Sequence, residues 1–153
     1  MLLRFLYILA QCTWGFPQSF LGFLLFLALG RQKHVWHGYA LMTVFDSENA
    51  KLKWPGCVSL GMFTFVNVSK NGSADPRIAA HEYGHTFQSL LLGPLYLIAV
   101  GIPSSLWALR YMKNRAQYGA KGIAYTARYP ENWAEHWGRR AARHAIAQSR
   151  MAE

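Results

Sequence analysis

Residues 75–93 read DPRIAAHEYGHTFQSLLLG, and this stretch decides the fold because it carries its own start and stop signals for a helix. Asp75 suits the capping position that precedes a helix, and Pro76 suits the first helical position. Gly93 suits the position just after the last turn. The stretch therefore predicts a helix over residues 76–92.

The motif His81-Glu82-Tyr83-Gly84-His85 lies inside this helix and has the HExxH spacing. Residues four apart share one face of a helix, so the imidazoles of His81 and His85 can hold one Zn²⁺ at about 2.0–2.1 Å. Glu82 can reach a water on that metal and act as the general base. The alternative interpretation is two surface histidines on an amphipathic helix.

A catalytic zinc site needs a further protein ligand, because such sites have three and keep one position open. Candidates are the remaining histidines and several acidic residues: His34, His37, Glu48, Asp75, Glu131, Glu135, His136 and His144. Glu131 and Glu135 stand out, because they lie one turn apart in the segment ENWAEHWG, residues 131–138. One carboxylate can bind the metal while the other holds a ligand histidine through a hydrogen bond. The alternative is a solvated acidic first turn favoured by the helix dipole.

Together, HEYGH and ENWAEHWG resemble the HExxH…ExxAD signature of the gluzincin metallopeptidases, and most of all the CaaX-prenyl-protease type. The resemblance implies that His81 and His85 are zinc ligands, that Glu131 is the third ligand and that Glu82 is the base. It puts Glu135 where that family has an aspartate beside a ligand histidine. The chain is far shorter than those enzymes, and as a whole it resembles small uncharacterised bacterial membrane proteins.

Two apolar runs, residues 1–30 and 90–109, point to a membrane. Charged residues make up only 15% of the chain, against about 25% in soluble domains. The first run can cross a bilayer as one helix or form two short helices joined at a Gly-Pro break. The second separates His85 from Glu131, which must meet at one depth. We therefore expect the second run to enter the membrane and turn back near residues 101–103; the alternative is that the helix carrying the histidines itself enters the bilayer.

Charge favours a membrane surface over nucleic acid. The chain has 16 Lys and Arg against 7 Asp and Glu, with the excess after Leu109. Basic residues gather on the cytoplasmic side of membrane proteins, and no basic-aromatic module for nucleic acid is present. The sequence predicts an integral membrane protein, in a bacterial inner membrane, whose active site faces the cytoplasm. The lipid bilayer is thus the first expected partner, and nothing in the sequence indicates an oligomeric state.

The residues between the first run and the metal helix favour a small sheet. Residues 35–45 and 57–68 read as two strands of an antiparallel sheet, and Gly61 indicates a bulge or a close backbone approach. The sequence thus predicts one α+β, membrane-embedded domain over residues 1–153. Its expected parts are a membrane segment (1–30), a sheet (35–68), a metal helix (76–92), a second membrane segment (90–109) and a C-terminal helix (130–150).

The predicted activity is peptide hydrolysis by a zinc-activated water, on a membrane-associated polypeptide. Arg139 and Tyr125 are the candidate stabilisers of the transition state. One alternative is a zinc hydrolase that cleaves a non-peptide bond such as a lipid amide. The other is a non-catalytic membrane protein with a structural metal, which would be closed by a fourth protein ligand.

Overall fold

The computed structural model describes residues 2–47, 56–68 and 74–151, so the candidate ligand Glu48 lies outside them. Within these residues a four-stranded sheet is combined with six α-helices, which confirms the α+β class. In chain order the elements are α1 (Leu2–Thr13), α2 (Phe16–Leu29), β1 (Lys33–His37), β2 (Ala40–Phe45), β3 (Val58–Leu60), β4 (Phe63–Asn67), α3 (Pro76–Leu92), η1 (Gly93–Leu95), η2 (Leu97–Gly101), α4 (Ile102–Lys113), α5 (Arg115–Ala120), η3 (Tyr125–Ala127) and α6 (Glu131–Met151).

The sheet is mixed, so the prediction of an antiparallel sheet is wrong for one pairing. The strand order is β1-β2-β4-β3, with β2 and β4 parallel and the other two pairs antiparallel. Each run that we expected to form one strand folds instead as a hairpin with a two-residue turn. Strand β3 lies at the edge of the sheet beside β4, and β4 runs in the same direction as β2.

Gly61 is the residue at which the second hairpin touches α2. Its φ is +64°, and a Cβ there would lie 2.0 Å from the Ser19 Oγ. A side chain would therefore be excluded both by conformation and by space. The close backbone approach expected at Gly61 is confirmed, at a tight turn and not at a bulge.

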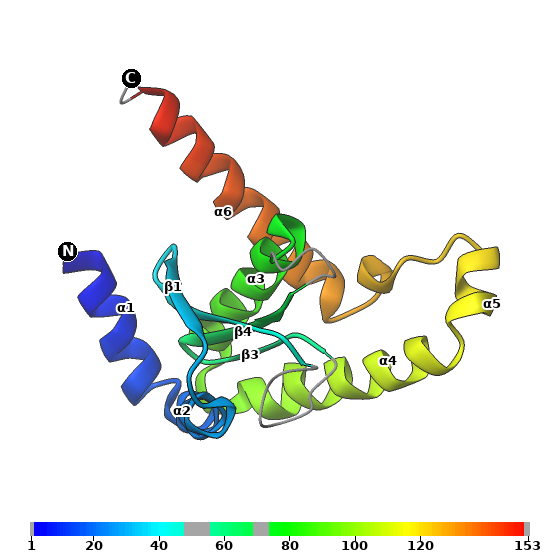
Figure 1. Cartoon of the computed structure of the whole chain (residues 1–153), viewed down its shortest axis with the longest axis horizontal. Helices are drawn as coiled ribbons and strands as arrows, with labels where there is room; N and C mark the ends of the chain where they lie inside the picture. The colour runs from blue at the N-terminus through cyan, green and yellow to red at the C-terminus, as the bar shows by residue number, and fades with distance from the viewer. Residues whose placement is uncertain (1, 48–55, 69–73, 152–153) are drawn as a thin grey trace.

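The metal helix has the predicted bounds, because its capping residues do what their chemistry favours. The Asp75 carboxylate accepts a hydrogen bond from the Arg77 N–H at 2.8 Å, and Pro76 occupies the first turn. Helix α3 covers the face of the sheet that carries Met42 and Val66, which pack with Ala79 of α3. On the other face, Phe63 contacts Phe23 and Phe26 of α2. Figure 1 shows α3 beside the sheet and α6 crossing α3 before it projects away from the body.

Helices α3 and α6 cross with their backbones in contact. A Cβ on Gly84 would lie 1.9 Å from the Ala134 carbonyl oxygen, and one on Gly138 would lie 2.0 Å from the Ala80 carbonyl oxygen. Each helix contributes two small residues four positions apart to this contact, Ala80 and Gly84 on α3 and Ala134 and Gly138 on α6. Only glycine permits such an approach. The crossing brings the first turn of α6 against the histidine face of α3.

The N-terminal run forms two short helices, α1 and α2, bent by 98° at the break between them. Buried polar side chains hold this pair to α3. The Gln11 amide donates to the Thr86 carbonyl oxygen at 3.1 Å, and the Gln18 amide donates to the Ser89 Oγ and the Gly93 carbonyl oxygen, both at 2.9 Å. Among the described residues no single helix is both long and apolar enough to cross a bilayer, although the bent pair would be if its two helices were counted together.

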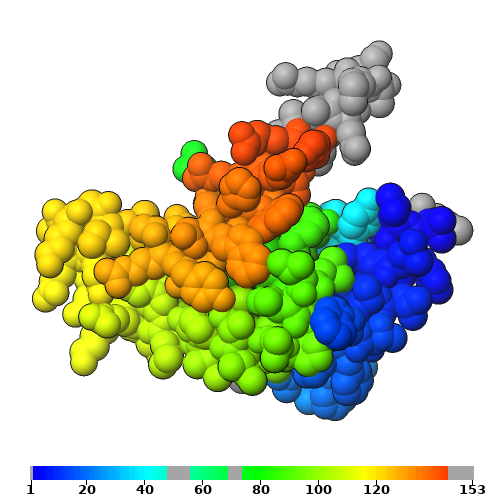
Figure 2. Space-filling model, turned by 180° about the vertical axis from the view of Figure 1, so that it is seen from behind, coloured from blue at the N-terminus to red at the C-terminus, as the bar shows by residue number. Residues whose placement is uncertain are grey.

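The expected reversal at residues 101–103 is wrong. The π-helical segment η2 passes directly into α4, and Gly101 and Ile102 both have helical backbone angles. Pro103 lies in the first turn of α4, where a missing N–H disturbs a helix least. The chain turns back only after Lys113, through α5. In Figure 2 the yellow α4–α5 segment and the orange segment leading into α6 form an arm on the side away from the blue α1.

Candidate metal centre

Two histidines from α3 and one glutamate from α6 meet in the interior. His81 Nε2 lies 2.9 Å and His85 Nε2 lies 3.4 Å from the same Glu131 carboxylate oxygen, Oε2. All three residues are buried, and their donor atoms lie within 4.8 Å of one another, so they could hold one metal ion. Ligands about 2.0–2.1 Å from a tetrahedral zinc lie roughly 3.3 Å apart. The observed spacing therefore leaves room for that ion with little movement.

The other ring nitrogen of each histidine has its own partner. His81 Nδ1 lies 3.1 Å from Glu135 Oε2, and His85 Nδ1 lies 2.7 Å from Gln88 Oε1. The Gln88 amide in turn donates to the Pro130 carbonyl oxygen at 3.0 Å. Such partners fix the tautomer and the orientation of ligand imidazoles. Both rings thus direct Nε2 at Glu131.

Two residues of the centre escaped the sequence analysis. Gln88 could have been found, because it follows His85 by three positions and so lies on the same helix face. Ser104, whose hydroxyl donates to Glu131 Oε1 at 2.5 Å, comes from α4, and no local pattern connects it with either motif. Its position depends on how the arm folds back over the site.

Glu82 lies beside the three potential ligands without joining them. Its Oε2 accepts a hydrogen bond from the Ser59 hydroxyl at 2.7 Å, and the residue is only 6% exposed. Burial raises the pKa of the Glu82 carboxyl. Glu82, His85 and Glu131 all line one cavity, so the carboxyl group faces the space where a bound molecule would sit.

His81 and Glu131 shift each other's pKa in opposite directions. Burial lowers the pKa of His81, but hydrogen bonds to Glu131 and Glu135 and the nearby carboxylates outweigh it and raise that pKa to about 9. Burial raises the pKa of Glu131, but hydrogen bonds from His81, His85 and Ser104 hold it well below its usual value. With both ring nitrogens facing carboxylates, the imidazolium form of His81 is favoured in the metal-free protein.

The cavity at this site has a volume of about 710 Å³ and a largely apolar wall. Strand β3 forms one side with Val58 and Leu60, and η2 and α4 form the other with Leu97, Leu106 and Leu109. The polar lining includes Glu82, His85 and Glu131. The space has the size and the lining that are typical of sites for small organic groups.

The two candidate transition-state stabilisers occupy different places. Tyr125 lines the cavity, and its ring centroid lies 6.4 Å from that of His81. Arg139 pairs with Glu135 at 2.5 Å and has a side chain that is 71% exposed. Arg139 therefore touches the centre only through the carboxylate that holds His81.

The other sequence candidates that the structure describes do not join the triad. His34 contacts the Thr43 hydroxyl at 3.1 Å, and the His37 ring packs edge-on against Tyr83. Asp75 caps α3. His136 and His144 are exposed on α6. The roles assigned to His81, His85, Glu131, Glu82 and Glu135 stay predictions, but the structure brings these residues together.

Comparison of the chain with protein-family models, with curated proteins and with solved structures found no match. A buried His-His-Glu group on a pair of helices is consistent with an HExxH-type site. The resemblance to the gluzincins therefore rests on the two motifs and on their meeting in space.

Proposed function

We propose that the protein is a zinc-dependent hydrolase, and specifically a peptidase of the HExxH type. The observation that carries this proposal is the meeting of His81, His85 and Glu131 beside a cavity that His85, Glu131 and Glu82 line. Two imidazoles and one carboxylate are a donor set that suits a catalytic zinc, which keeps a position open. A structural site would need a fourth protein ligand, and the described residues around the triad offer none.

The residues of the chain then have distinct tasks. Zinc at the triad would supply a Lewis acid and lower the pKa of water. Glu82 would take a proton from the attacking water in the cavity and pass it to the leaving amine. The Tyr125 hydroxyl is the better placed of the two candidate stabilisers, because Tyr125 lines the cavity and Arg139 does not. Glu135 and Gln88 hold the ligand rings in their working orientation.

The substrate proposed for this cavity is an apolar stretch of a membrane-associated polypeptide. Leu97, Leu106 and Leu109 would contact its side chains, and β3 is an edge strand of the sheet. An extended peptide can pair with such an edge. The same apolar wall also suits the chain of a lipid amide, so that reaction is the alternative. Hydrolysis of a quenched apolar peptide but not of an N-acyl amide would separate the two.

The partner proposed for the outer surface is a lipid bilayer. Large apolar side chains are exposed along three helices, including Leu3 and Phe5 on α1, Leu27 on α2, and Leu106 and Leu109 on α4. Exposed apolar surface of this extent marks an interaction surface. The basic residues beyond Leu109 favour the cytoplasmic side.

The decisive experiment is metal analysis of purified wild type, His81→Ala, Glu82→Gln and His144→Gln, combined with a peptide-hydrolysis assay. We expect His81→Ala to lose zinc, because a ligand is gone. Glu82→Gln should keep zinc and lose hydrolysis by about 100-fold or more. His144→Gln removes an exposed histidine of α6 and should change neither quantity. Stoichiometric zinc in His81→Ala would refute the metal centre, and an active Glu82→Gln would refute the base.

A further inference from the structure

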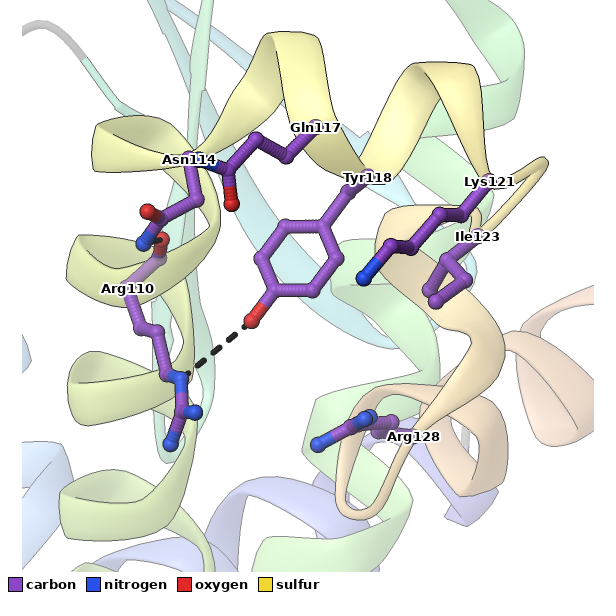
Figure 3. A pocket seen from close by; sticks show the side chains of 7 residues that line it. All are labelled: Arg110, Asn114, Gln117, Tyr118, Lys121, Ile123 and Arg128. Atoms are coloured by element: carbon purple, nitrogen blue, oxygen red, sulfur yellow. Dashed lines mark hydrogen bonds between the residues drawn. The ribbon is translucent and has the colours of Figure 1, made fainter.

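A second cavity lies at the tip of the arm, away from the metal centre, and its wall is basic. It has a volume of about 300 Å³. Its polar lining comes from the end of α4, from α5 and from the residues on either side of η3: Arg110, Asn114, Gln117, Tyr118, Lys121 and Arg128. Figure 3 shows Arg110, Lys121 and Arg128 reaching from three sides toward the space beside the Tyr118 hydroxyl. We call this cavity the basic pocket.

The three cations of the basic pocket have no acidic neighbour in its wall. In the part of the chain that the structure describes, the salt bridges involve only His81, His85, Glu131, Glu135 and Arg139. Three like charges around one cavity repel one another, and an anion between them would relieve that repulsion. The pocket therefore has the charge of an anion site.

The basic pocket is built on an aromatic cluster. The Tyr111 and Tyr118 rings stack in parallel at 5.5 Å, and the Trp107 ring lies 5.3 Å from that of Tyr118. The Arg128 guanidinium lies 4.9 Å from the centroid of the Trp107 ring, and Arg110 Nε donates to the Tyr118 hydroxyl at 3.2 Å. Aromatic contacts thus hold both arginines, and most of their N–H donors stay available for a ligand.

An apolar stripe runs along α4 and lines the first cavity, and the basic pocket lies on the adjacent side of the same helix, about 100° around from the stripe. Ile102, Leu106, Leu109 and Met112 are 54–68% exposed. Their spacing of four, three and three residues puts them on one side of the helix. Arg110 lies between the last two of them in sequence. A phosphate next to an apolar phase is the arrangement found at the headgroup level of a bilayer.

We propose that the basic pocket binds a phosphate group, which the neighbouring stripe indicates is the phosphodiester of an anionic lipid. Arginine presents paired N–H donors that match phosphate oxygens, and lysine adds a point charge. The Tyr118 hydroxyl supplies a neutral donor in the same wall, and the Asn114 amide, which donates one N–H to the Arg110 carbonyl oxygen at 2.9 Å, has a second N–H. This inference goes beyond the proposed hydrolase, because it needs neither zinc nor turnover.

The test is calorimetric titration of the detergent-solubilised, zinc-loaded protein with three probes at constant ionic strength. The probes are inorganic phosphate, short-chain phosphatidylglycerol, and diacylglycerol of the same chain length, which lacks the phosphate. The pocket variant combines Arg110→Gln, Lys121→Gln and Arg128→Gln. The control variant combines Arg31→Gln, Arg77→Gln and Arg140→Gln, which removes the same charge from exposed positions elsewhere.

We expect wild type to bind phosphatidylglycerol more tightly than diacylglycerol. Each cation near an anionic surface contributes about fivefold in affinity, so the pocket variant should bind roughly 100-fold more weakly. The single variant Lys121→Gln should bind about fivefold more weakly, and it guards against misfolding of the triple variant. Zinc content should stay unchanged in every variant, which separates this result from a failure of the metal centre.

Wild type could instead bind inorganic phosphate but not phosphatidylglycerol, with the pocket variant binding neither. That result would support the phosphate site but would identify its ligand as a soluble phosphate and not a lipid. Equal affinity of phosphatidylglycerol for the pocket variant and wild type, with no phosphate binding by either, would overturn the proposal. Equal weakening by the control variant would overturn it as well, since net charge alone would then explain the binding.

Discussion

At the scale of single residues, the hydrogen bonds behind the two histidines matter as much as the triad itself. Glu135 Oε2 contacts His81 Nδ1 and its Oε1 pairs with Arg139, so this carboxylate connects the centre to the surface of α6. Removal of such a partner typically weakens metal binding 10–100-fold, roughly, while the ligands remain. Glu135 is therefore the position where a small chemical change should have a measurable effect.

We predict that Glu135→Gln lowers zinc affinity by about 10–100-fold and leaves zinc stoichiometry at saturating metal unchanged. The glutamine keeps the size of the side chain but loses the charge that favours the His81 Nδ1–H. Competition with a chromophoric chelator measures the affinity. His136→Gln, one position away and exposed, should match wild type. Unchanged affinity in Glu135→Gln would show that the 3.1 Å contact does not support the ligand.

The protonation of His81 predicts how the metal-free protein responds to pH. Its pKa is raised to about 9 from 6.5, so the imidazolium stabilises the fold. That contribution is fully present below about pH 6.5 and is lost as pH rises through about 9. We expect the thermal stability of chelator-treated wild type to exceed that of His81→Gln at pH 6.5 and to approach it above pH 9. A constant difference across this window would contradict the paired imidazolium.

At the scale of elements, the crossing of α3 and α6 is what turns two motifs into one site. Because the Gly84 and Gly138 Cα atoms face carbonyl oxygens of the partner helix, any Cβ would push the helices apart. His81 lies three positions before Gly84, and Glu135 lies three positions before Gly138. Separation of the helices would therefore open the gap between the histidines and their carboxylates.

We predict that Gly84→Ala and Gly138→Ala each destabilise the protein by about 2 kcal/mol or more, as overpacking of a close contact does. Each should also weaken zinc binding. Gly119→Ala is the matched control, because it lies in α5 with open space at its Cβ position. Alanine there should be neutral or stabilising by up to about 1 kcal/mol. Thermal unfolding in detergent measures the stability of all three variants. A Gly84→Ala variant as stable as wild type would contradict the close contact between α3 and α6.

The elements also show where the sequence was informative. The bounds of α3 were predictable because Asp75, Pro76 and Gly93 act locally. The hairpins were not predicted, because each turn is only two residues long and is marked by a single glycine, Gly38 or Gly61, within a longer run that favours a strand. The parallel pair β2–β4 depends on contacts between hairpins, and the path through Gly101 depends on a π-helical segment. Neither leaves a local signal.

The candidate site divides in the same way. His81, His85 and Glu82 share one helix, so a spacing rule was enough to find them. Glu131 needed a second motif 46 residues after His85. Ser104 comes from α4 and Ser59 from β3, and each contacts the site only through the tertiary fold. Spacing within a helix is thus readable from sequence, whereas the walls of the cavity are not.

At the scale of the whole molecule, the exposed apolar surface and the cavity beside the metal centre are continuous. Ile102, Leu106, Leu109 and Met112 line the cavity and are also among the most exposed apolar side chains. A bilayer against α4 would therefore meet the opening of the cavity, and an apolar substrate could pass from lipid to the metal centre without crossing water. The exposed face of α4 would then both contact the membrane and admit the substrate to the cavity.

We predict that Ile98→Asp weakens membrane association without loss of zinc, because Ile98 is 68% exposed and is not among the residues that line the cavity. Transfer of a large apolar side chain into lipid is worth about 1.5–3 kcal/mol, so binding to neutral vesicles should fall roughly 10-fold or more. Flotation with phosphatidylcholine vesicles measures this. His144→Asp introduces the same carboxylate on exposed α6 and should float like wild type. If both variants float equally well, α4 and the segment before it do not face lipid, and the cavity opens to water instead.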